Sequence, residues 1–216
     1  MLLFYELALE AKGAHGLFIP IRSKRSALIN AFTMIKRSSW SQYMTRQPES
    51  GDYFAFDQKL GRAFIVAGDT THSIAFPFTL IVSNQIQMAS VNWKTLHIGA
   101  DVASLAISVL SEANDPYVNL IDSVRRIAND DYNGIIIDHE SVAYMLSDLI
   151  DLDDGYFRHE HDPAHANGRV HPIDHIDFYH ADSVSIKIGV EKRLSLDTIQ
   201  HIASEEHEAF YLEEPR

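Results

Sequence analysis

Cysteine is absent from all 216 residues of the chain. Its absence excludes disulfides, cysteine nucleophiles and thiolate metal sites, so histidine, aspartate and glutamate would have to hold any metal. Long apolar runs are absent too, since none approaches the roughly 20 residues that span a bilayer. The apolar start meets Glu6 and Glu10 early and carries no basic leader, which argues against a signal peptide. We therefore expect a cytoplasmic protein without membrane contact.

The chain also lacks a glycine-rich phosphate loop, a dinucleotide-binding fingerprint and a serine nucleophile elbow. Functions that depend on ATP, GTP or NAD are therefore disfavoured. Hydrophobic residues make up 46% of the chain, which is enough to build a sizeable core. We predict one α+β domain over residues 1–216. The alternative is a subdivision near residue 100 into a basic, strand-rich half and an acidic, helical, histidine-rich half.

Apolar residues at helical spacing predict several helices. They cover residues 24–37 with Ser23 as N-cap, a segment from Asp101, a segment that opens at Asp115-Pro116, residues 139–151 and residues 195–206. Between the first two helices, strand-like segments at 53–56, 62–67, 73–82 and 85–98 predict an antiparallel sheet. Residues 2–9 are either a strand or a buried helical turn, and residues 135–137 a short strand or the start of a helix.

The last part of the chain is expected to hold a long polar loop, a hairpin and a helix. The loop covers residues 156–172, and the hairpin joins residues 175–180 to residues 184–190. Residues 209–212 are a candidate final strand. This order of elements predicts the α+β class, in which an antiparallel sheet is combined with a helical section and a C-terminal hairpin plus helix.

Charge is unevenly distributed along the chain. Residues 1–100 hold ten Lys/Arg and six Asp/Glu, whereas residues 101–216 hold eight and 24, and the net charge is −12. The stretch from Ala11 to Pro48 contains seven basic residues and no acidic one. Such a region attracts phosphate, for example that of nucleic acid, or it neutralises the acidic half within the fold. The candidate substrate-binding residues are Arg22, Lys24, Arg25, Lys36 and Arg37.

Histidines concentrate in one segment, with six of the twelve lying between residues 159 and 180. Histidine binds metals and titrates near neutral pH, so histidines among carboxylates suit a metal site or acid–base catalysis. The candidate metal ligands are His159, His161, Asp162, His171 and His175, with zinc, manganese or magnesium as the ion. The alternative is a solvated surface, in which Arg158 and Arg169 pair with Glu160 or Asp162. The isolated histidines, including His72, are expected to be structural.

Strand alternation sharpens the catalytic candidates. Neighbouring residues of a strand face opposite sides of the sheet, so His175, Asp177 and Tyr179 should share one face. Pairing the apolar faces of the hairpin adds Lys187 to that polar surface. The candidate catalytic residues are therefore His171, His175, Asp177, Tyr179 and Lys187, with the lysine placed to stabilise developing negative charge.

Two functions from different classes follow from these patterns. The first is a hydrolase, most plausibly a nuclease or phosphodiesterase, that recruits its substrate through the basic N-terminal segment and cleaves it at the His/Asp cluster, with or without a divalent metal. The second is an acidic protein without catalytic activity, such as an antitoxin, an inhibitor or a subunit of a complex. Its acidic C-terminal half would bind a basic protein.

Overall fold

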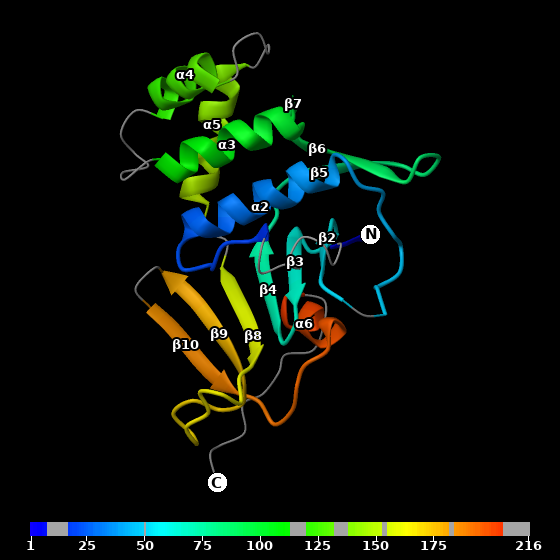
Figure 1. Cartoon of the computed structure of the whole chain (residues 1–216), viewed down its shortest axis with the longest axis vertical. Helices are drawn as coiled ribbons and strands as arrows, with labels where there is room; N and C mark the ends of the chain where they lie inside the picture. The colour runs from blue at the N-terminus through cyan, green and yellow to red at the C-terminus, as the bar shows by residue number, and fades with distance from the viewer. Residues whose placement is uncertain are drawn as a thin grey trace.

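Seven strands from both ends of the chain pair into one antiparallel sheet in the computed structural model shown in Figure 1. The strand order is β1 (Leu2–Glu6), β2 (Tyr53–Asp57), β3 (Arg62–Ala67), β4 (Thr70–Ala75), β8 (Tyr156–His161), β9 (Asp174–Ala181) and β10 (Val184–Gly189). The structure describes residues 1–7, 17–49, 51–112, 120–131, 138–152, 155–181 and 184–204, with the backbone alone at 131, 179–181, 184 and 185.

The helices confirm much of the predicted pattern. They are α2 (Lys24–Ser38), α3 (Ala100–Glu112), α4 (Leu120–Asp131), α5 (His139–Asp151) and α6 (Leu196–Ile202). Ser23 caps α2 as predicted, because its Oγ accepts a hydrogen bond from the Ser26 amide. None of the helices in these ranges is long and apolar enough to cross a bilayer. The predicted features at residues 115–116, 135–137 and 209–212 lie outside the described residues.

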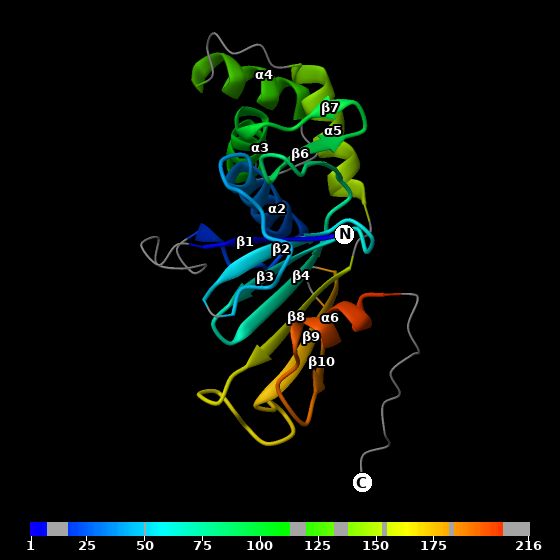
Figure 2. The same cartoon turned by 90° about the vertical axis from the view of Figure 1, so that its right-hand side faces the viewer.

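The sheet is covered on both faces. Leu3, Phe54 and Ile65 lie on the α2 side of the sheet in the larger core, while Phe64 and Phe157 share the smaller core with Ile199 of α6. Figures 1 and 2 show α3, α4 and α5 stacked beyond α2 on the side away from the sheet. The helical section lies between β4 and β8 in sequence, yet these two strands pair directly. Strands from both sides of residue 100, where the charge changes, therefore belong to one sheet.

Three sequence predictions are wrong in detail, one of them the strand expected over 85–98, which is divided by a turn at residues 94–95. The strand expected over 73–82 is divided at Pro77, because proline cannot donate a ladder hydrogen bond. Its second half is β5 (Thr79–Ser83), which forms a separate sheet with β6 (Met88–Trp93) and β7 (Leu96–His97). The polar loop expected over 156–172 begins only at Asp162, since residues 156–161 form β8. Buried and more exposed residues alternate along β8, with Phe157 and His159 buried, but most of its residues are polar and the alternation is not visible as an apolar pattern.

Candidate metal centre

Two rows of side chains cross the face of the sheet that carries α2. Residues opposite each other in adjacent strands are close neighbours, so each row is a line of side-chain contacts. The first row runs through Ile65, His72, Arg158, Asp177 and Lys187. The second row runs through Ala67, Thr70, Glu160, His175 and Gly189. Both rows change from apolar residues on β3 to polar and charged residues on β4, β8 and β9.

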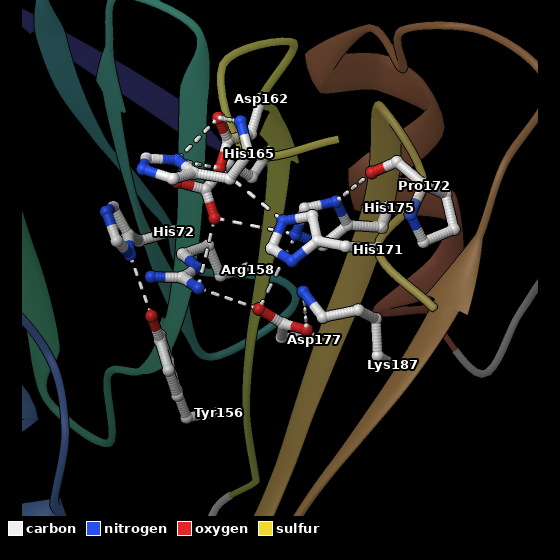
Figure 3. Close-up of polar contacts among 11 residues, drawn as sticks. His72, Tyr156, Arg158, Asp162, His165, His171, Pro172, His175, Asp177 and Lys187 are labelled. Carbon is white, nitrogen blue, oxygen red and sulfur yellow. Dashed lines mark hydrogen bonds and ion pairs between the residues drawn. The ribbon is translucent and has the colours of Figure 1, made fainter. Parts of the chain in front are cut away.

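Glu160, His175 and Asp177 form a carboxylate–histidine cluster where the two rows cross β8 and β9. One ligand atom from each side chain lies within 4.8 Å of the others. His175 Nε2 is 3.5 Å from Glu160 Oε2 and 3.8 Å from Asp177 Oδ2. Two ligands that each lie about 2.1 Å from one ion can be at most about 4.2 Å apart, so both contacts of His175 are within reach of a shared ion. Figure 3 shows His175 and Asp177 of β9 beside Arg158 of β8.

The ring of His175 is held in one orientation by the loop that precedes β9. Nδ1 lies 2.9 Å from the carbonyl oxygen of Pro172. A carbonyl only accepts, so Nδ1 carries the hydrogen, and neutral His175 has its lone pair on Nε2. Nε2 is fully buried and makes no hydrogen bond within the described part of the chain. A histidine whose second nitrogen donates to a carbonyl is the usual arrangement of a metal-binding imidazole.

Two cations already contact the carboxylates of the cluster. Arg158 Nη2 lies 3.0 Å from Glu160 Oε2 and 2.7 Å from Asp177 Oδ2, so it bridges the two acids. Lys187 Nζ lies 2.8 Å from Asp177 Oδ1. Burial raises the pKa of Asp177, but hydrogen bonds from Lys187 and Arg158 outweigh it and hold that pKa below its ordinary value. Asp177 is therefore ionised at neutral pH, and a metal ion in the cluster would have to displace Arg158 from between the two carboxylates.

The loop between β8 and β9 supplies a second layer of histidines. The His171 ring packs edge-on against the His175 ring, with 4.8 Å between the ring centres. His171 Nε2 is 3.4 Å from Asp162 Oδ2, and His165 Nδ1 is 2.9 Å from the same oxygen. Burial raises the pKa of Asp162, whereas its hydrogen bonds with His165 lower it, and the net effect is a lowered pKa. Asp162 thus organises the loop, and His171 supports His175.

The remaining metal candidates lie away from the cluster. His159 is buried on the opposite face of the sheet, where its Nε2 accepts a hydrogen bond from the Leu194 amide at 3.3 Å. Burial lowers the pKa of His159 in spite of the nearby Asp174. His161 Nδ1 is paired with Asp174 Oδ1 at 2.8 Å. The structure therefore brings His171 and His175 together and keeps His159 and His161 apart from them, because alternation sends odd-numbered β8 residues to the other face.

The catalytic candidates of the hairpin occupy the expected register. Lys187 lies opposite Asp177 in the ladder, and His175 shares their face, as strand alternation predicts. Tyr179 lies on β9, but its side chain is outside the described part of the structure. Glu160 was not predicted as a ligand, and Arg158 and His72 were not predicted as site residues. The alternation of Arg158 and Glu160 with the buried Phe157 and His159 was the signal that could have placed them on a strand.

The predicted substrate-binding residues are spread along α2 rather than gathered at one end. Arg22 and Lys24 lie at the start of the helix, whereas Lys36 and Arg37 lie at its end, about 18 Å further along its axis. Arg25 Nε donates a hydrogen bond to the Leu110 carbonyl and so joins α2 to α3. Arg22, Lys36 and Arg37 are exposed. Arg25 therefore contributes to helix packing, and the other four residues are separated into two pairs.

Comparison with known protein families, curated proteins and solved structures gives no match for this chain.

Proposed function

We propose that the chain is a metal-dependent hydrolase of phosphodiester bonds, with the ion held by Glu160, His175 and Asp177. The observation that carries this proposal is the buried Nε2 of His175, which makes no hydrogen bond with the described residues and faces two carboxylates. A buried polar atom without a partner costs about 1–3 kcal/mol, and a metal ion removes that cost. Two carboxylate oxygens and one imidazole suit zinc or manganese, and leave coordination positions for water and substrate.

The charge of the site supports a phosphate substrate. In the metal-free state the positive charges of Arg158 and Lys187 balance the negative charges of Glu160 and Asp177. A divalent ion would raise the net charge of this group to +2 and release the guanidinium of Arg158 from the carboxylates. Arginine binds phosphate through paired N–H donors, and lysine stabilises negative charge that develops on phosphoryl oxygens. Held by Glu160, His175 and Asp177, such an ion would activate a water molecule for attack on phosphorus.

Nucleic acid is the phosphodiester that the basic residues of α2 favour. Arg22, just before α2, and Lys36 and Arg37, at its end, are exposed cations of the segment that covers the site face of the sheet. We expect binding of single-stranded DNA or RNA to weaken steeply with salt, because each neutralised phosphate releases counterions. Replacing Lys36 and Arg37 together by methionine should reduce the slope of log affinity against log salt by about 1.4 for a single strand. An unchanged slope would show that the end of α2 does not contact the strand.

The decisive experiment is a metal titration of chelator-treated protein, followed by thermal unfolding. Zinc or manganese at a hundredfold excess over its dissociation constant should stabilise the fold by about 2.7 kcal/mol. Glu160→Gln should abolish this shift, while Glu140→Gln, which alters an exposed ion pair with Arg125, should retain it. Hydrolysis of bis(4-nitrophenyl) phosphate should require the same ion and the same glutamate.

Two results would overturn the proposal. One is a wild-type protein that neither gains stability with any divalent ion nor hydrolyses the diester. The other is hydrolysis that survives complete chelation, which would assign the chemistry to His175 acting as an acid–base group without metal. Because Glu160→Gln preserves the shape of the side chain, its effect separates loss of a ligand from loss of the fold.

A further inference from the structure

A cavity of about 240 Å³ lies on the same face of the sheet, directly beside the carboxylate–histidine cluster. Its floor consists of the β3, β4 and β8 members of the two rows, namely Ile65, Ala67, Thr70, His72, Arg158 and Glu160. Its roof is the segment 18–21 together with Asn30 of α2. Arg158 and Glu160 belong both to the cavity wall and to the polar site. A group held in the cavity therefore borders the proposed metal ion.

The roof of the cavity is fixed by a buried side chain. Asn30 is only 1% exposed, its Oδ1 accepts a hydrogen bond from the Ile19 amide at 3.0 Å, and its Nδ2 donates to the Ile19 carbonyl at 2.8 Å. These two hydrogen bonds hold the segment 18–21 over the sheet in the absence of a ligand. A preformed cavity loses less conformational entropy when it binds a ligand than one that has to be ordered first.

We propose that this cavity is the substrate pocket of the site and binds the organic group of a small phosphate ester, whose phosphate contacts Arg158. The assignment of Arg158 to phosphate rests on the proposed function, in which a metal ion frees its guanidinium. The apolar wall, formed by residues 18–21, Ile65 and Ala67, suits an aromatic or similar compact group. The polar end suits the charged phosphate through His72 and Arg158, while Glu160 would hold the metal ion.

The volume of the cavity limits the substrate. Pockets for drug-sized ligands usually measure about 300–1,000 Å³, so a cavity of about 240 Å³ accepts only a smaller group. One nucleotide unit, either free or at an unpaired position of a single strand, belongs to this class. A base that remains stacked in a duplex is covered by its neighbours and cannot enter the cavity, so unstacking would have to come first.

The reaction in this pocket is ordinary hydrolysis. The oxygen of water bonds to phosphorus, and the bond between phosphorus and the leaving oxygen breaks. One proton of the water ends on the leaving alcohol, and the other remains on the phosphate or passes to a base. The products are a phosphate monoester and an alcohol, so no oxidant, reductant or further reactant is needed.

Phenyl phosphate, the product of hydrolysing diphenyl phosphate, is the direct probe of the pocket. Calorimetric titrations with phenyl phosphate and with inorganic phosphate, each carried out with and without zinc, measure what the organic group contributes. We expect phenyl phosphate to bind the zinc-loaded protein at least tenfold more tightly than inorganic phosphate. Ala67→Leu, which fills the floor of the cavity, should remove that advantage and leave the binding of inorganic phosphate unchanged.

The matched control is Ala89→Leu. Ala89 is also a buried alanine in a strand that borders a cavity, but it lies in the β5–β6–β7 sheet. This variant should retain the tenfold preference. If Ala67→Leu does not fold, Thr70→Leu fills the same cavity from a half-buried position and replaces it.

The outcomes separate this proposal from the proposed function. The pocket proposal is wrong if phenyl phosphate and inorganic phosphate bind with equal affinity. It is also wrong if a folded Ala67→Leu or Thr70→Leu variant keeps the preference for phenyl phosphate. Absence of a metal-induced thermal shift overturns the metal site, and that measurement does not involve phenyl phosphate. The preference for phenyl phosphate can persist in the presence of a chelator and be removed by Ala67→Leu. That result supports the pocket even if the metal site is wrong.

Discussion

His175 donates its Nδ1 hydrogen to the carbonyl oxygen of Pro172, 2.9 Å away, and this bond directs Nε2 towards Glu160 and Asp177. The proline is held in turn by the edge of the sheet. Gly189 lies opposite His175 in the β9–β10 ladder, and a Cβ atom added to Gly189 would come within 2.8 Å of Pro172 Cγ. The absence of a side chain at Gly189 thus allows the loop to hold the ring of the candidate ligand.

Gly189→Ala should therefore weaken the site through Pro172. The added methyl group pushes the proline ring away and stretches the hydrogen bond to His175, and such overpacking costs about 1–3 kcal/mol of unfolding free energy. We expect lower stability and weaker zinc binding, measured by urea denaturation and by calorimetry. Pro172→Ala in the same chain removes the closest ring atom and should restore part of both losses. Additive losses in the double variant would show that the two residues do not interact.

Asp177→Asn should be among the more destabilising polar substitutions in the sheet. The Asp177 side chain is 4% exposed and contacts both Arg158 and Lys187, so its loss leaves two cations facing a neutral amide. Removing one partner of a buried ion pair costs about 3–5 kcal/mol, and partial exposure of the two cations favours the lower end. Asp148→Asn removes the exposed ion pair with Lys94 and should cost less than about 1 kcal/mol. Similar urea midpoints for the two variants would contradict this view.

The parts of the fold that follow from local chemistry could be predicted from the sequence. Ser23 is followed by apolar residues at helical spacing, and the predicted helix 24–37 ends one residue before the observed α2. The Asp177–Lys187 pairing followed from strand alternation and a short connection between the strands. In both cases neighbouring residues determine the structure, and no information about distant segments is needed.

The parts that depend on distant segments could not be predicted. β4 and β8 are separated by the helical section, so nothing local indicates that His72 lies opposite Arg158. The cavity depends on the same pairing and on the return of residues 18–21 over the sheet. Glu160 was assigned to a polar loop because a buried histidine, His159, occupies a position where strands usually carry an apolar residue.

Asp138 gives a pH-dependent test of the α5 boundary. Hydrogen bonds from the hydroxyl and the amide of Ser141 lower the pKa of Asp138 below its ordinary value. The unfolded chain therefore binds the proton more readily, and the stabilisation is present above about pH 4 and lost as the pH falls further. Asp138→Asn keeps a capping side chain but cannot ionise. The difference in melting temperature between wild type and Asp138→Asn should be largest at neutral pH and vanish in acid. A difference in melting temperature that does not change with pH would show that the charge of the Asp138 carboxylate does not contribute to the cap.

We expect His72 to give a proton to the leaving alcohol of the proposed reaction. It lies opposite Arg158 on the cavity wall, and its Nδ1 shares a 2.8 Å hydrogen bond with the hydroxyl of Tyr156. This role rests on the proposed function, and positioned proton donors contribute about 10²- to 10⁴-fold to such reactions. We expect His72→Gln to slow hydrolysis of diphenyl phosphate, whose phenolate is a poor leaving group, far more than that of bis(4-nitrophenyl) phosphate.

The dependence on the leaving group separates proton donation from a structural role. A variant that only disturbs the pocket slows both diesters by the same factor, because the two substrates differ little in shape. A proton donor accelerates the reaction most when the leaving oxygen is most basic. Loss of the donor therefore slows mainly the hydrolysis of diphenyl phosphate. Tyr156→Phe, which removes only the partner of His72, should show the same trend with a smaller loss. Equal slowing of both diesters by His72→Gln would assign His72 to the wall of the cavity alone.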